Sequence, residues 1–179
     1  MVKAVIANAE NISQSTLKRI TEKDIRALLK EVMDPEIPRL SVVDLGMITG
    51  VNIDDENKVE IIMTPTFAGC PAVDILKSEI KNKILELPVK DVDVKVNFDV
   101  QWTSDMISDE GKKILKESGF SAPPKLNNNF VSIEMLTKVE CPFCGSKKTR
   151  LQSPFGATLC RAMHYCDNCH QAFEQFKPI

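Results

Sequence analysis

The strongest chemical signal in the sequence is a pair of Cys-x-x-Cys motifs near its C-terminal end. Two intervening residues let both sulfurs of a motif reach one ion while the backbone amides turn back toward them. Two such motifs supply the four ligands of a closed tetrahedral site, namely Cys141, Cys144, Cys166 and Cys169. This pattern predicts a structural zinc ion, with iron or an iron–sulfur cluster as the alternative for four thiolates.

Another cysteine, Cys70, lies between Gly69 and Pro71, where a strand pattern changes to a helix pattern. Proline suits the first helical position, where a missing N–H costs nothing, so Cys70 is expected at or near the helix N-cap. A thiol in that position faces open amides and the positive end of the helix dipole, which lowers its pKa. Cys70 is therefore predicted to be a reactive thiol, with a small buried apolar residue as the alternative.

The remaining candidate ligands give weaker signals. Cys160 lies six residues before Cys166, outside the paired spacing, and is expected to pack under the ribbon, with a cluster ligand or exchange site as the alternative. His164 and His170 are not expected to bind the metal. They are the only histidines, so the first 120 residues lack the base that usually activates a cysteine nucleophile, which argues against thiol catalysis.

Apolar periodicity predicts the elements that position Cys70. Strands and helices alternate along the first 120 residues, which is typical of a small α/β sandwich with helices on one face of a sheet of about three to four strands. The expected elements are a helix from Thr21 that ends before Asp34, a hairpin over 51–63, a helix over 73–87, a strand over 92–100 and a short helix over 108–118.

The composition changes after residue 120. A stretch rich in proline and asparagine, without periodicity, indicates a linker. The segment that follows it is too small to bury enough apolar surface alone, so a metal-stabilised β-ribbon is expected, with strands over 149–152 and 159–165. The predicted parts are a leader (1–20), the α/β domain (21–120), the linker (121–129) and the ribbon (130–179).

Overall composition fits a globular protein in a reducing compartment. Of 179 residues, 43% are hydrophobic, and the formal net charge at pH 7 is −2. The sequence has no apolar run of the roughly 18 residues that span a membrane and no recognisable signal peptide, which favours a cytoplasmic location. Six cysteines in that compartment indicate metal or thiol chemistry rather than disulfides.

Motifs along almost the whole chain resemble a known family. The first part is similar to the domain of SufT-like and cytosolic iron–sulfur assembly proteins, over roughly residues 20–120. The ribbon adds further matches, and together the two parts resemble PaaD-type accessory subunits of phenylacetyl-CoA epoxidase. The matching motifs are Asp34-Pro-Glu36-x-Pro38, Ser41-x-x-Asp44-Leu45-Gly46, Thr66-x-x-Gly69-Cys70-Pro71, Cys141-Pro-x-Cys144-Gly-Ser, Phe155-Gly-x-Thr158-x-Cys160-Arg-Ala162, and Cys166-x-x-Cys169 followed by Phe173, Phe176 and Lys177.

The resemblance implies a non-enzymatic factor that loads or matures a metal centre in a client enzyme. Cys70 would be the cluster-transfer thiol, holding a transient iron–sulfur cluster whose other ligands come from the client or from a second copy of the chain. In the epoxidase system the client would be a di-iron oxygenase or an iron–sulfur reductase component. The residues expected to support the loop around the thiol, or to cap it, are Asp34, Glu36, Asp44 and Thr66.

The alternative function is a zinc-ribbon adaptor that binds an oxygenase complex or nucleic acid without transferring metal. Nucleic acid is the less favoured partner, because residues 130–179 contain six Lys/Arg against four Asp/Glu. That surplus is small for phosphate binding, which normally gathers several basic side chains on one face.

Overall fold

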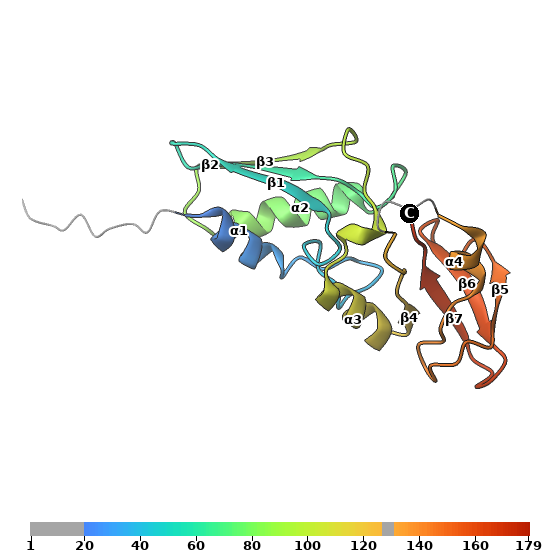
Figure 1. The fold of residues 1–179 in the computed structure, drawn as a ribbon. Helices are drawn as coiled ribbons and strands as arrows, with labels where there is room; N and C mark the ends of the chain where they lie inside the picture. Colours follow the sequence, from blue (N-terminus) through green and yellow to red (C-terminus); the bar gives the residue numbers. More distant parts are fainter. Residues whose placement is uncertain (1–19, 127–130) are drawn as a thin grey trace, which may run out of the picture.

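The computed structural model describes residues 20–126 and 131–179, which contain two sheets (Figure 1). The first sheet has the order β1 (Ile48–Ile53), β2 (Lys58–Met63), β3 (Asp91–Val96). The second has the order β4 (Phe120–Ser121), β7 (Ala172–Phe176), β6 (Arg161–Cys166), β5 (Thr149–Ser153). This mixed architecture confirms the predicted fold class. Of the predicted leader, all but Ile20 lies outside the described residues.

The first sheet is a hairpin extended by a crossover. β1 and β2 pair antiparallel, and β3 joins β2 in parallel after the chain has passed through helix α2 (Val73–Ile84). Helix α1 (Glu22–Leu29) lies beside α2 on the same face of the sheet (Figure 1). Val92 and Val94 of β3 are buried on that side and the residues between them are exposed, which matches the predicted period of two.

Side-chain caps account for two helix starts. Thr21 Oγ1 accepts a hydrogen bond from the Asp24 N–H, and the Asp24 carboxylate accepts one from the Thr21 N–H, so α1 begins with a capping box. Ser108 caps α3 (Asp109–Glu117) by accepting from the Gly111 N–H. Within residues 20–126 and 131–179, no helix has the length and apolar character needed to cross a bilayer.

Strand β3 is shorter than the strand predicted over 92–100. It ends at Val96, after which the Asn97 side chain accepts a hydrogen bond from the Asp99 N–H and turns the chain. Phe98 is consequently exposed rather than buried. The alternation of apolar residues continues past the strand, so the sequence pattern alone does not mark where pairing stops.

The ribbon contains the predicted hairpin and a further strand, β7. β5 pairs antiparallel with β6, as expected from the pattern over residues 149–165, and β6 pairs antiparallel with β7. β7 was not predicted, and neither was the five-residue helix α4 (Ile133–Thr137). Both are too short to display a clear apolar period.

The ribbon is packed against the first domain at several points. Strand β4, at the end of the first domain, pairs in parallel with β7. Phe176 of β7 belongs to the core of the first domain, where its ring lies 5.9 Å from that of Trp102. Leu126, in the described part of the predicted linker, is buried, and its N–H donates to Asp105 (2.8 Å). The chain therefore returns to the first domain before and after the ribbon.

Replacing Phe176 with alanine is expected to destabilise the first domain, although this residue belongs to the ribbon. Phe176 is 2% exposed, and truncating a buried phenylalanine costs about 3–5 kcal/mol. Urea unfolding followed by the fluorescence of Trp102, the one tryptophan in the sequence, measures the change. Phe155→Ala is the matched control: Phe155 is 60% exposed and should change the free energy of unfolding by less than about 0.5 kcal/mol. A wild-type midpoint for F176A would contradict the packing described here.

Candidate functional site

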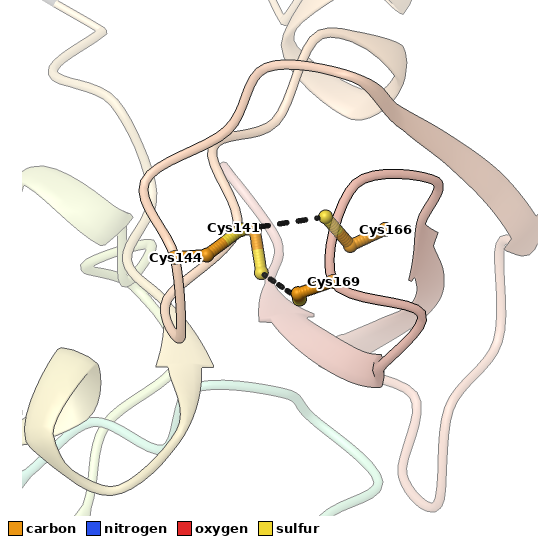
Figure 2. A group of neighbouring side chains, drawn as sticks. All are labelled: Cys141, Cys144, Cys166 and Cys169. Atoms are coloured by element: carbon orange, nitrogen blue, oxygen red, sulfur yellow. Dashed lines mark hydrogen bonds between the residues drawn. The ribbon is translucent and has the colours of Figure 1, made fainter.

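The four paired cysteines converge on one point in the ribbon (Figure 2). Their sulfur atoms all lie within 4.8 Å of one another. The Cys141 and Cys169 sulfurs are 3.7 Å apart, and those of Cys144 and Cys166 are 3.6 Å apart. Zn–S bonds of about 2.3 Å in a tetrahedron place sulfurs about 3.8 Å apart. The arrangement fits a four-coordinate metal ion.

The two Cys-x-x-Cys turns share the same backbone geometry. In the first, the Gly145 N–H donates to the Cys141 carbonyl (2.9 Å); in the second, the His170 N–H donates to the Cys166 carbonyl (2.9 Å). Gly145 and His170 both have positive φ, +69° and +58°, which lets each turn close immediately after its second cysteine. His170 therefore has a backbone role, and its ring lies beside Tyr165 rather than at the sulfurs.

The thiols differ in how readily they ionise without metal. A hydrogen bond from the Ser146 N–H lowers the pKa of Cys144 to about 7. Partial burial and the neighbouring Cys144 thiol raise the pKa of Cys169 to about 12. Four thiolates so close together repel one another, so a cation is needed to hold all of them deprotonated, and metal binding must release protons.

A second group of candidate residues lines a cavity of about 230 Å³ between the first domain and the ribbon. This volume lies a little below the roughly 300–1,000 Å³ typical of pockets for organic ligands. The lining side chains that can act as ligands or hydrogen-bonding groups are Asp34, Glu36, Thr66, Cys70, Thr158, Cys160 and Arg161.

Cys70 lies in the loop before α2, not at the helix N-cap. The N-cap is Ala72, and Val73 is the first helical residue, so Pro71 precedes the helix. Burial raises the pKa of the Cys70 thiol, and the hydrogen bond from the Ala72 N–H offsets only part of that rise. The prediction of a lowered pKa is therefore wrong, because desolvation destabilises the thiolate more than the helix end stabilises it.

Of the four residues expected to support the thiol loop, three line the cavity and Asp44 does not. Asp34 lines the cavity, and its carboxylate accepts hydrogen bonds from the Glu36 and Ile37 amides, 2.9 Å each. Thr66 also lines the cavity. Asp44 is not among the lining residues; its carboxylate accepts hydrogen bonds from serine hydroxyls, those of Ser41 (2.7 Å) and Ser108 (2.8 Å). Asp44 thus holds a loop against the start of α3.

Arg161 connects the two halves of the cavity wall and was not predicted as a site residue. Its side chain is buried, and it donates to Glu36 (3.0 Å) from the first domain and to Glu174 (3.1 Å) from β7. Its guanidinium also lies 4.9 Å from the centre of the Phe120 ring. The motif around Cys160 already contained this arginine, but its partners are distant in the sequence.

Cys160 faces the same cavity and is half-buried. Its sulfur lies 3.1 Å from Thr158 Oγ1, and burial raises the pKa of its thiol. His164 is buried and stacks on Phe173 with ring centres 5.4 Å apart. In the described ranges, the ribbon cysteines are the only group of three or more Cys, His, Asp or Glu ligand atoms gathered within 4.8 Å.

Comparison with known proteins found two family models that match separate parts of the chain. Residues 22–97 match the family model of an iron–sulfur cluster assembly protein, and residues 128–177 match that of the PaaD zinc beta ribbon domain. An Escherichia coli protein, named as one subunit of a "Putative 1,2-phenylacetyl-CoA epoxidase", is 37% identical over 156 residues, which cover 87% of this chain and 92% of that protein.

Other known proteins are similar to the first domain but not to the ribbon. A Porphyromonas gingivalis protein named "Fe-S protein maturation auxiliary factor" is 38% identical over 101 residues, covering 56% of this chain and 92% of that protein. The crystal structure of a domain of unknown function, DUF59, from Bacillus anthracis is 31% identical with a TM-score of 0.50, covering 52% of this chain and 90% of that one.

Fold and site together define a class of protein in which an iron–sulfur cluster assembly domain is joined to a zinc β-ribbon. Within this class, the chain belongs to the PaaD family of phenylacetyl-CoA epoxidase subunits, because the Escherichia coli relative matches it over almost its whole length. The resemblance inferred from the motifs is confirmed. The names of the other relatives, maturation auxiliary factors and a cluster carrier, agree with the predicted accessory, non-enzymatic role.

Cys141→Ser is expected to abolish metal binding at the ribbon, because the remaining thiolates leave the tetrahedral site one ligand short. Elemental analysis of the purified protein should find about one metal ion per chain in the wild type and almost none in the variant. Cys70→Ser is the matched control, since it makes the same change outside the ribbon and should retain the ribbon metal. Equal metal content in C141S and wild type would contradict the four-sulfur site.

Alkylation of Cys70 is expected to be slow at neutral pH. Burial raises its pKa, so less of the reactive thiolate is present at neutral pH than for an exposed thiol. Iodoacetamide rates across a pH series, measured at the Cys70 peptide by mass spectrometry, should therefore have a midpoint above that of the same peptide in the unfolded chain. The urea-unfolded chain is the control and should show an ordinary midpoint near about 8.5. A folded-state midpoint below that of the unfolded chain would contradict the effect of burial.

Proposed function

We propose that this chain is an accessory maturation factor that delivers iron or an iron–sulfur cluster to a metalloenzyme, with Cys70 as the thiol that holds the cargo. The cluster assembly domain and the names of its relatives support the general role. The observation that carries the assignment to Cys70 is its position in the wall of a small cavity between the two domains. We place this function in the cytoplasm, where thiols stay reduced.

The cargo site differs from the ribbon site in the number of sulfur ligands. Four closely spaced thiolates surround an ion completely and hold it permanently, as structural sites do. The cavity contains no such preassembled set among the described residues, so a metal there keeps open coordination positions. A carrier needs this property, because the recipient must attach its own ligands before the cargo leaves.

The raised pKa of Cys70 suits a carrier that is empty between deliveries. A protonated thiol is a poor nucleophile and reacts slowly with oxidants or electrophiles. Iron is a strong enough Lewis acid to replace the proton when it arrives, so the sulfur becomes a thiolate only when it is needed.

For the ribbon we propose zinc with a structural role. The sulfur spacings of 3.7 and 3.6 Å match a tetrahedral zinc site, and zinc undergoes no redox change that would interfere with iron chemistry. Cys141, Cys144, Cys166 and Cys169 would hold the ion and fix the two turns. The ion would thereby stabilise the sheet that forms one wall of the cavity.

The client we propose is a metal-containing component of a phenylacetyl-CoA epoxidase, since the Escherichia coli relative is named as a subunit of that enzyme. Either a di-iron oxygenase or an iron–sulfur reductase component could receive iron from such a carrier. The client, or a second copy of this chain in a homodimer, would supply the ligands that the cavity lacks.

An adaptor role is the second candidate, and one feature of the ribbon favours it. Phe143 and Phe155 are more than half exposed on the ribbon surface, and aromatic side chains are enriched where proteins bind one another. As an adaptor, the ribbon would bind the oxygenase complex and Cys70 would have no part in metal transfer. The two roles therefore predict opposite effects of a Cys70 substitution.

Cys70→Ser is expected to reduce client maturation by about tenfold or more, because removing a metal-binding group has at least the effect of removing one of its supporting contacts. The measurement is the iron content and activity of the client purified from cells that co-express each variant. Cys141→Ser, which removes the ribbon metal, separates the two roles. A fully matured client with C70S but not with C141S would exclude the carrier function and support the adaptor.

A further inference from the structure

We propose that Cys160 is the second thiol of the Cys70 site, so that two sulfurs from different domains bind one iron centre across the cavity. This inference rests on the proposed function and names the second ligand for its cargo. The shared chemistry is thiolate coordination of iron, whether the iron arrives as a single ion or within a cluster with sulfide.

The fold brings the two cysteines to one place although they are distant in the sequence. Both line the same cavity of about 230 Å³, and both contact the first-domain core at its edge. The loop before β6 is fixed on both sides of Cys160, since the Arg161 N–H donates to Thr158 (3.1 Å) and the Cys160 carbonyl accepts from the Lys177 N–H (2.9 Å). Cys160 therefore has a defined position within the ribbon, and the neighbouring Arg161 joins this loop to Glu36 of the first domain.

The carboxylates of the cavity are occupied by other contacts. Asp34 accepts two backbone hydrogen bonds from its own loop, and Glu36 forms an ion pair with the buried Arg161. The two thiols are the sulfur ligands that the cavity offers, and thiolates are the ligands that iron–sulfur centres use.

Hydrogen-bonding groups lie in the cavity wall near the cysteines. Thr158 Oγ1 lies 3.1 Å from the Cys160 sulfur. Arg161 is 6% exposed, lines the cavity, and has an Nε–H without a hydrogen-bond partner in the described structure. Buried donors normally find a partner, and a thiolate sulfur bound to iron would be an acceptor for this one.

Binding replaces two S–H bonds with two S–Fe bonds and releases two protons to solvent. The oxidation state of iron does not change, so no oxidant or reductant is required. Iron in a sulfur site is usually four-coordinate, which leaves positions for ligands from the client. Transfer is completed when the client's thiolates or carboxylates replace Cys70 and Cys160, which recover their protons.

The first test measures iron binding to the zinc-loaded full chain under anaerobic conditions. Equilibrium dialysis against Fe²⁺ alone, and against Fe²⁺ with sulfide, distinguishes the ion from the cluster as cargo. Cys70→Ser and Cys160→Ser should each weaken iron binding by about tenfold or more. Leu159→Ala is the matched control, because Leu159 lines the cavity beside Cys160 but offers no ligand, and its iron binding should equal that of wild type.

The second test asks directly whether the two thiols are within reach of one atom. Phenylarsine oxide joins two nearby thiols through two As–S bonds and releases one water, which intact-protein mass spectrometry detects. The zinc-loaded wild type should take up one arsenical, and C70S and C160S should take up none. Retained zinc and unchanged Trp102 fluorescence would show that each variant is folded.

Failure of the inference and failure of the proposed function give different results. If C160S binds iron like wild type and the wild type takes up no arsenical, the two-thiol site is excluded, while a client that C70S leaves without iron still supports the carrier function. If C70S matures the client normally, the carrier function is excluded even where both thiols bind iron in vitro.

Discussion

The guanidinium of Arg161 is the polar contact on which the arrangement of the two domains depends. One buried cation serves Glu36 of the first domain and Glu174 of the ribbon and also lies against the ring of Phe120. Removing these charges from water is costly, and only good geometry compensates for it. Such a contact contributes orientation more than stability. The orientation it selects places the loop before β6 opposite the loop before α2, and the cavity exists because these two loops face each other.

Cysteine serves two different purposes in this chain because its surroundings differ. In the ribbon, four sulfurs converge closely enough to surround one metal ion, as the ligands of a structural site do. In the cavity, burial favours the protonated thiol at both Cys70 and Cys160, as their raised pKa values indicate. A cysteine is thus a metal ligand in the ribbon and a protonated thiol in the cavity. The difference comes from the number of neighbouring thiols and from the access of water to the sulfur.

Local signals in the sequence predicted much of this structure. The helix start at Thr21, the burial of Val92 and Val94 in β3 and the convergence of the ribbon cysteines all follow from patterns between residues close together in the sequence. The end of β3 does not, because the apolar alternation continues past Val96. The pKa of Cys70 was not predicted correctly, because the loss of water around it comes from packing between segments distant in the sequence. Arg161 was missed for the same reason: its motif was visible, but Glu36 lies 125 residues away. Contacts between the two domains could not be predicted from a single sequence.

The packing of Phe176 against Trp102 also bears on the order in which the protein is made. Synthesis proceeds from the N-terminus, and early domains usually begin to fold before later ones emerge. Here the first domain leaves the ribosome without an aromatic ring that its own interior requires, and that ring arrives only after both pairs of ribbon cysteines. Until then the nascent first domain is incomplete and Cys70 has no opposing wall, so that thiol is sheltered only after the ribbon has folded.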